Sequence, residues 1–311
     1  MKILIGSNGG LAGIYLAKCY KLMKGITLFG IDSADDNTGR FFVDKQLVAP
    51  PASNPEFIEK LINILNKYEI DVYLPTHSKE IAVISKNEQI LHQKTKTRFL
   101  VSPIETFDLL ENKKLANYHL KTAGIPVPKL IDSFDCNYPI LLKPDVGSGS
   151  NHIIIIENEE IHKAYIKTAK QASFYQFITG PQFTVDCMFD AKGQLIGANQ
   201  RKRIKCIGGA VSITTNSEEY DIYPWISIFA KNWTFCGCVN FQYILHNNTP
   251  YFTDINLRYP SGGLPLTVKS GLNIPELTLQ VLYNKPYELF VRKKDNDQLS
   301  MYRYFEEIFD K

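Results

Sequence analysis

Residues 138–150 read YPILLKPDVGSGS. The apolar run Ile140–Leu142 has strand length, ends at Lys143, and is followed directly by a glycine-serine loop. A buried strand that ends in a lysine is unusual, because an ammonium group is costly to bury without a partner. Backbone N–H groups of such a loop can close over a phosphate. The stretch therefore favours phosphate binding over the alternative, an ordinary strand–loop–strand hairpin with a surface lysine.

An oxygen-rich cluster lies on a second hairpin, predicted over residues 239–256. Asp254 and Asn256 are two residues apart on its second strand, so they share a face. Gln242 lies on its first strand, and Arg258 follows the second strand. Carboxylate and amide oxygens beside a guanidinium suit a Mg²⁺ ion that bridges phosphate oxygens. The alternative is a solvated polar strand face.

The first hundred residues alternate between strands and helices. Apolar runs predict strands at Lys2–Gly6, Ile26–Asp32, Asp71–Pro75 and Phe99–Ser102. Helical spacing predicts helices at Leu11–Met23, Asn54–Glu69 and Lys79–Gln93. This βαβα order predicts a parallel sheet with helices on both faces.

The rest of the chain is predicted to form a small α+β unit and then a mostly antiparallel one. The small unit is expected to contain helices at Thr106–Leu110, Lys113–Thr122 and Ile161–Gln171 and strands at Ile140–Lys143, Ile153–Glu157 and Phe174–Ile178. The second unit is expected to contain the hairpin Phe183–Asp190 and Leu195–Arg203, the hairpin at residues 239–256, and helices at Asp221–Asn232 and Ile274–Tyr283.

The loop after the first strand is a weaker candidate for nucleotide binding. It reads Asn8-x-Gly10-x-x-Gly13, a G-x-G-x-x-G pattern without its first glycine. Asp32 ends the next strand at a distance suited to a ribose contact. Similar turns occur in many doubly wound domains that bind no dinucleotide.

Two further pairs of residues are candidates for substrate binding. Arg201 and Arg203 share a strand face and could clamp an anion, although a solvated basic strand end is the usual explanation. His77 and Glu80 follow the third predicted strand, at the carboxyl end of a parallel sheet, where ligands tend to bind. A single histidine in such a place is more often structural.

Composition narrows the class of protein. The 311 residues carry a net charge of +3, so no global field attracts nucleic acid or an acidic membrane. No run approaches the ~20 apolar residues of a membrane span, and the N-terminus MKILIGSNGG lacks the features of a secretory signal. Six scattered cysteines form no CxxC pair, which is typical of reduced thiols. We therefore expect a cytoplasmic protein without nucleic-acid or membrane partners.

Several blocks, taken in order, resemble the ATP-grasp superfamily, and more closely its carbamoyl-phosphate-synthase-like members. The blocks are Asn112–Pro128, Tyr138–Ser150, Gln176–Asp186 and Asp254–Arg258. The resemblance implies an α/β plus α+β fold. A Rossmann-like pre-ATP-grasp domain would cover residues 1–105, a small lid subdomain residues 106–178, and a large subdomain with C-terminal helices residues 179–311.

The resemblance also implies roles for individual residues. ATP is expected to contact Lys113, Lys143, Gly147, Ser148, Gly149, Gln176, Phe177, Ile178 and Gln182. One or two Mg²⁺ ions, or Mn²⁺, are expected at Gln242, Asp254 and Asn256. The expected catalytic residues, which would stabilise charge as the γ-phosphoryl group moves to a substrate carboxylate, are Arg258, Lys143 and Asn256. An amine or another nucleophile would then displace phosphate from the acyl-phosphate.

This sequence departs from the family pattern at four positions. Gln176 and Gln182 stand where glutamates usually contact adenine and ribose, Asp254 replaces a glutamate, and Leu257 replaces a proline. Amide oxygens accept the same hydrogen bonds more weakly than carboxylates.

The first interpretation is an ATP-dependent ligase that joins a small-molecule carboxylate to an amine or another nucleophile, with a homodimer as one option for its assembly. The second is a catalytically inactive ATP-binding module with the same fold. A remote third is an NAD(P)-dependent oxidoreductase that uses the N-terminal glycine loop.

Overall fold

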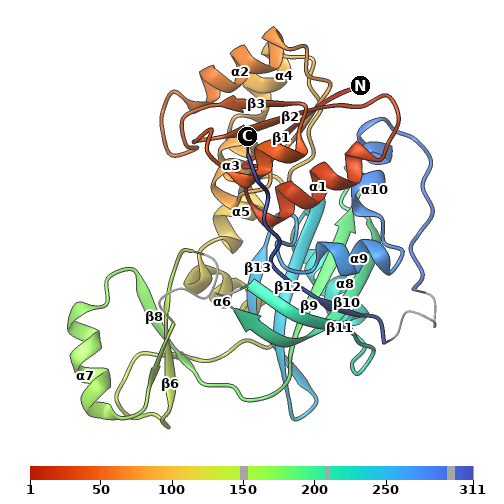
Figure 1. The fold of residues 1–311 in the computed structure, drawn as a ribbon. Coiled ribbons are helices and arrows are strands. Elements are labelled where there is room, and N and C mark those ends of the chain that lie inside the picture. Colours follow the sequence, from red (N-terminus) through yellow and green to blue (C-terminus); the bar gives the residue numbers. More distant parts are fainter. Residues whose placement is uncertain (148–152, 208–209, 293–297, 311) are drawn as a thin grey trace.

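The computed structural model describes residues 1–147, 153–207, 210–292 and 298–310, and these residues form three sheets (Figure 1). The N-terminal α/β unit lies at the top of Figure 1, directly above a six-stranded sheet, and a four-stranded sheet stands to one side. The predicted fold class, a parallel α/β unit followed by antiparallel α+β structure, is confirmed.

The N-terminal sheet is parallel, with the strand order β3-β2-β1-β4. Its strands are β1 (Lys2–Gly6), β2 (Thr27–Asp32), β3 (Lys45–Val48) and β4 (Val72–Leu74). Its helices are α1 (Leu11–Lys21), the short 3₁₀ helix η1 (Thr38–Phe42), α2 (Phe57–Lys67), α3 (Ser78–Lys86) and α4 (Glu88–Lys94). Ile3 and Ile5 pack with α1, whereas Leu4 packs with α2 and α3, so helices cover both faces of the sheet as predicted.

Two local predictions in this unit are wrong. The segment Phe99–Ser102 is not a strand, and only Arg98 bridges to β4. The chain then turns away, because the carbonyl of Ser102 accepts a hydrogen bond from Ser85 and Pro103 has no N–H for a ladder. The helix predicted over residues 79–93 is interrupted at Asn87, whose side-chain amide bonds the carbonyl of Val83 and so competes with the helical ladder.

The large sheet is antiparallel, with the order β13-β12-β9-β10-β11-β14. Its strands are β9 (Gln182–Phe189), β10 (Leu195–Ile207), β11 (Ala210–Asn216), β12 (Gly237–His246), β13 (Thr249–Asn256) and β14 (Ser300–Tyr302). Both predicted hairpins, β9–β10 and β12–β13, are present. The accompanying helices are α8 (Tyr223–Asn232), α9 (Leu264–Lys269) and α10 (Ile274–Leu282).

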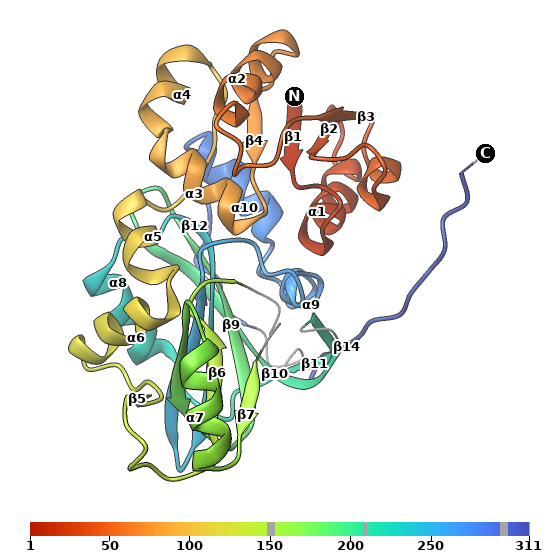
Figure 2. The same cartoon turned by 90° about the vertical axis from the view of Figure 1, so that its left-hand side faces the viewer.

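The four-stranded sheet has the order β5-β8-β6-β7, and α7 covers one of its faces (Figure 2). Its elements are β5 (Leu130–Ile131), β6 (Ile140–Pro144), β7 (Ile154–Ile156), α7 (Glu159–Thr168) and β8 (Ala172–Gln176). The helices α5 (Ile104–Leu110) and α6 (Lys113–Thr122) precede it in the chain. The predicted division at residues 105 and 178 stays a prediction.

Buried apolar side chains show which parts of the chain pack together. One cluster joins Leu4 of β1 to Phe229 of α8 and Phe241 of β12, and it also takes in Phe107 of α5 and Leu120 of α6. A separate small cluster fills the four-stranded sheet and consists of Ile140, Leu142, Ile156 and Phe174. The N-terminal unit and the large sheet therefore share a core, whereas the four-stranded sheet has its own.

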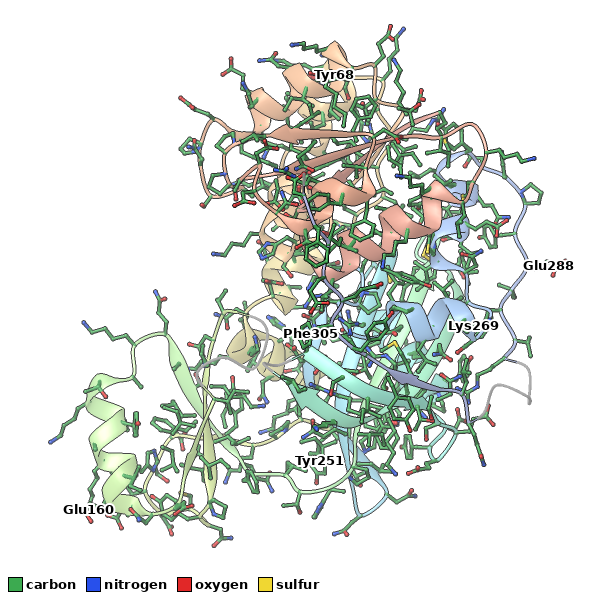
Figure 3. The ribbon with its side chains drawn as sticks, viewed as in Figure 1. Tyr68, Glu160, Tyr251, Lys269, Glu288 and Phe305 are labelled. Atoms are coloured by element: carbon green, nitrogen blue, oxygen red, sulfur yellow. The ribbon has the colours of Figure 1, made fainter. Side chains whose placement is uncertain are left out.

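Figure 3 labels side chains in different parts of the molecule. Tyr68 lies at the outer end of the N-terminal unit, Glu160 lies on α7 at the opposite extreme, and Tyr251 lies on the β12–β13 hairpin. Within the described ranges, every helix is too short or too polar to cross a bilayer.

Candidate functional site

A chain of polar contacts runs along the end of β13, where the oxygen-rich cluster was predicted. The Asn256 amide donates to Asp254 Oδ2 at 3.1 Å, and Arg258 Nη2 donates to Asn256 Oδ1 at 3.1 Å. Burial lowers the pKa of the Arg258 guanidinium, and the charges of Asp254 and Glu111 oppose this effect. The prediction that Asp254 and Asn256 share a face therefore agrees with their direct contact.

Two lysines lie near the same carboxylate. Lys113 begins α6, whose N-terminus is capped by Asn112, and its Nζ lies 3.8 Å from Asp254 Oδ1. Lys143 ends the apolar part of β6, and burial lowers the pKa of its ammonium group, an effect that Asp254 opposes and Lys113 reinforces. Two half-buried cations thus face a single carboxylate, an arrangement that a phosphate would stabilise.

Gln242 faces Asp254 across the β12–β13 ladder, but its oxygen already has a partner. Arg203 Nη1 donates to Gln242 Oε1 at 2.7 Å. Gln242 and Arg203 come from strands separated by β9, so this bond depends on the register of three strands. No group of three or more His, Cys, Asp and Glu side chains that could hold a metal ion occurs among the described residues.

A cavity of about 770 Å³ opens between the four-stranded sheet and the large sheet. The predicted ATP and metal residues that line it are Lys113, Lys143, Gly147, Phe177, Ile178, Gln182, Gln242 and Asp254. Ser148 and Gly149, which were predicted to contact ATP, lie outside the described residues. A volume of this size suits a nucleotide, because ligand pockets commonly measure roughly 300–1,000 Å³.

Gln176 lies away from this cavity. Its Oε1 accepts a hydrogen bond from the backbone N–H of Lys129 at 3.3 Å, and its side chain lines a different hollow of about 320 Å³ beside Lys129 and Cys136. A contact between Gln176 and adenine stays a prediction. The neighbouring residues Phe177 and Thr179 do line the 770 Å³ cavity.

A second large cavity, of about 700 Å³, lies against the N-terminal unit. His77 and Glu80 both line it, together with Arg258. Burial is the main cause that raises the pKa of Glu80 to about 7, although Tyr73 and Ser7 donate hydrogen bonds to its carboxylate. Burial also lowers the pKa of His77. Near neutral pH this cavity therefore presents a largely neutral imidazole and a carboxyl group close to its titration midpoint.

The N-terminal glycine loop is occupied by internal contacts. Asn8 and Gln46 exchange side-chain hydrogen bonds at 2.8 and 3.1 Å. The backbone N–H of Gly9 donates to Asp32 Oδ2 at 3.1 Å, so the carboxylate predicted to hold a ribose already binds the loop itself. Gln46 lies on the short edge strand β3, which is not among the predicted strands. These contacts argue against the nicotinamide interpretation.

A third, small cavity of about 40 Å³ is lined by three arginines, Arg201, Arg203 and Arg258. Arg201 forms an ion pair with the fully buried Asp186, with 2.9 Å between Nε and Oδ2. Its Nη1 and the Nε of Arg203 are buried without a hydrogen-bond partner among the described residues. Buried donors of this kind normally have a partner, so the cavity is suited to a small anion.

The three cavities adjoin one another. Arg203 and Gln242 line both the 770 Å³ cavity and the small cavity, whereas Arg258 and Ser261 line both the small cavity and the 700 Å³ cavity. The small cavity with its three arginines therefore adjoins both larger cavities, which also share Val146 and Gly147 directly. Asn256, like Gln176, lines none of the three, and its side chain contacts Asp254 and Arg258.

Sequence comparisons find one family model that matches part of this chain, and distant relatives that are much longer than it. Residues 172–303 match a family model described as ATP-grasp in the biosynthetic pathway with Ter operon. The chain is 22% identical to pyruvate carboxylase of Bacillus subtilis, over 94% of this chain and 28% of that protein. It is 23% identical to the chloroplastic arginine-specific large chain of carbamoyl phosphate synthase from Oryza sativa subsp. japonica, over 56% of this chain and 18% of that protein. The chain thus spans less than a third of either relative.

Solved structures match over nearly the whole chain. One is N5-carboxyaminoimidazole synthetase from Staphylococcus aureus complexed with ADP, with a TM-score of 0.73 and 15% identity over 92% of this chain and 78% of that one. Another is the biotin carboxylase domain dimer of Hydrogenobacter thermophilus 2-oxoglutarate carboxylase, in complex with MgADP, ADP and bicarbonate. It has a TM-score of 0.71 and 16% identity over 96% of this chain and 72% of that one. These comparisons confirm the predicted resemblance to the ATP-grasp superfamily and its carbamoyl-phosphate-synthase-like members: the chain has the ATP-grasp fold.

Proposed function

We propose that the chain is an ATP-dependent ligase that activates a small-molecule carboxylate as an acyl-phosphate and transfers the acyl group to an amine or another nucleophile. The observation that carries this proposal is that three cavities adjoin one another, the small one sharing Arg203 and Gln242 with one large cavity and Arg258 with the other. The 770 Å³ cavity would take ATP, the small arginine-lined cavity the carboxylate, and the 700 Å³ cavity the rest of the substrates.

The residues around Asp254 suit Mg-ATP. Lys113 and Lys143 would neutralise phosphate oxygens, and the lowered pKa of Lys143 would return towards its ordinary value when an anion binds beside it. Asp254 supplies the carboxylate that a divalent cation needs, and Gln242 supplies an amide oxygen opposite it. A bound Mg²⁺ would neutralise the charge that develops on the phosphates.

The small cavity would position the carboxylate for attack on the γ-phosphorus. The buried donors Arg201 Nη1 and Arg203 Nε have no partner among the described residues and could each bind one carboxylate oxygen. A cavity needs about 10–15 Å³ to hold one water molecule. The arginine-lined cavity of about 40 Å³ can therefore hold a group of a few heavy atoms, such as a carboxylate. A carboxylate oxygen would attack the γ-phosphorus and ADP would leave, with Arg258 stabilising the charge at the border of the cavities.

The second half of the reaction, the attack of the nucleophile on the acyl-phosphate, would take place in the 700 Å³ cavity. The nucleophile would attack the acyl carbon, phosphate would leave, and a proton would pass from the nucleophile to a base. Glu80, with a pKa of about 7, and His77 are the titratable groups placed to receive it. No side chain has to act as a covalent nucleophile, because positioning and electrostatics suffice for phosphoryl transfer.

The inactive ATP-binding module is the second candidate, and Gln182 on the wall of the nucleotide cavity favours it. The two candidates differ in turnover. Short carboxylates would be incubated with Mg-ATP and hydroxylamine, which traps an acyl-phosphate as a hydroxamate, and ADP release would be measured in parallel. If the chain is a ligase, at least one of the carboxylates will give both ADP and a hydroxamate. If it is the inactive module, it will bind ATP and form neither product with any of them.

The variants Lys143→Met and Asp254→Asn test the assignment of the site. Each is expected to lower ADP release at least a hundredfold, as loss of a group that stabilises developing charge usually does. Lys163→Met is the matched control, because Lys163 is exposed on α7 and pairs with Glu159. Full turnover in both site variants would overturn the proposal.

A further inference from the structure

The contact between Arg203 and Gln242 bears on how many metal ions the nucleotide site can take. Gln242 Oε1 is the oxygen that was predicted to be a metal ligand, and it accepts a hydrogen bond of 2.7 Å from Arg203 Nη1. A divalent ion bound to the same oxygen would lie about 2–2.5 Å from it. The ion and the guanidinium nitrogen would then be at most about 5 Å apart, so the two cations would repel each other.

The second predicted amide ligand is engaged in the same way. Asn256 Oδ1 accepts a hydrogen bond of 3.1 Å from Arg258 Nη2, and the Asn256 amide nitrogen, rather than its oxygen, faces Asp254. Asp254 is thus the one carboxylate among the described residues that line the 770 Å³ cavity. Lys113, Lys143 and Arg203 line that cavity as well, so its positive charges outnumber its negative ones before any ion binds.

We infer that the nucleotide site takes one divalent cation, held by Asp254, and that the Arg203 guanidinium on Gln242 supplies the charge that a second ion would bring. This inference rests on the proposed binding of Mg-ATP. Arg203 borders both the nucleotide cavity and the small cavity, so its charge lies where the γ-phosphoryl group would pass from ATP to the carboxylate. A fixed guanidinium in that place neutralises phosphate charge without a second ion.

The test counts bound Mn²⁺ by electron paramagnetic resonance, which detects the free ion. The protein and a non-hydrolysable ATP analogue would be mixed at equal concentrations, well above the dissociation constant of their complex, and titrated with Mn²⁺. The wild type is expected to bind one Mn²⁺ per complex. The double variant Arg203→Met/Gln242→Glu is expected to bind two, because it removes the guanidinium and places a second carboxylate opposite Asp254 in the β12–β13 ladder.

Lys202→Met is the matched control, because Lys202 precedes Arg203 on β10 but bonds Glu219 instead. It is expected to keep one Mn²⁺. Two ions or none in the wild type would overturn the inference, whether or not the double variant folds. One ion in a folded double variant would refute the role given to Arg203. The count requires nucleotide binding but no turnover, so it can succeed or fail independently of the ADP and hydroxamate assay that tests the ligase.

Discussion

Glu80 offers a direct test of the electrostatics of the N-terminal cavity. Its side chain is 4% exposed, and burial raises its pKa from the ordinary 4.5 to about 7. An acid with a raised pKa in the folded state stabilises the fold fully below its unfolded pKa, and this stability is lost as the pH rises through the folded pKa. The window here runs from about pH 4.5 to about pH 7.

The size of the effect follows from the shift. One pKa unit corresponds to about 1.4 kcal/mol, so the wild type is expected to lose between about 2 and 3 kcal/mol of stability from this group between pH 5 and pH 8. The variant Glu80→Gln keeps the shape of the side chain and has no such ionisation. For a chain of this length, the entropy of unfolding converts the difference to about 4 °C in the unfolding midpoint.

The assay is thermal unfolding of wild type and Glu80→Gln from pH 5 to pH 8. The midpoint of the variant relative to wild type is expected to rise by about 4 °C across this range, whatever constant offset the substitution introduces. Glu59→Gln is the control, because it makes the same chemical change on the exposed face of α2. Parallel curves for wild type and Glu80→Gln would refute the raised pKa and, with it, the role of Glu80 as a base near neutral pH.

Three further predictions concern packing and ligand binding. Arg201→Met is expected to cost roughly 3–5 kcal/mol in urea unfolding, because the buried Asp186 loses its ion-pair partner, and a cost under about 1 kcal/mol would contradict this. Gly6→Ala would place its Cβ 2.1 Å from Oε1 of Glu80, so we expect a loss of about 1–3 kcal/mol in the same measurement, and unchanged stability would show that the carboxylate can move away. Mg-ATP at about a hundred times its Kd is expected to add about 2.7 kcal/mol and to raise the unfolding midpoint visibly, whereas stabilisation by NADH alone would restore the oxidoreductase interpretation.

Local chemistry made much of the site predictable. The period of two along a strand places Asp254 beside Asn256, and their hydrogen bond follows from that spacing. The apolar run that ends at Lys143 likewise predicted a half-buried cation, which lies on the wall of the 770 Å³ cavity. Both features depend on residues that are close together in the sequence.

Features that depend on pairing between distant strands were not predictable. Arg203 meets Gln242 only because β10, β9 and β12 pair in one particular register, which no single stretch of sequence records. The pairing of Asn8 with Gln46 depends in the same way on β3, an edge strand of four residues that is too short to give a clear strand pattern. The side chain of Gln176 could not be placed either, because its orientation depends on its pairing with Lys129.

The separate apolar cluster of the four-stranded sheet has a consequence for local stability. Four fully or nearly buried side chains hold this sheet together, and they belong to none of the clusters that join the N-terminal unit to the large sheet. Cooperative unfolding units tend to follow such boundaries. We therefore expect the sheet that carries Lys143 to unfold locally while the large sheet stays folded, so that its amide hydrogens exchange with solvent sooner than those of β9 and β12.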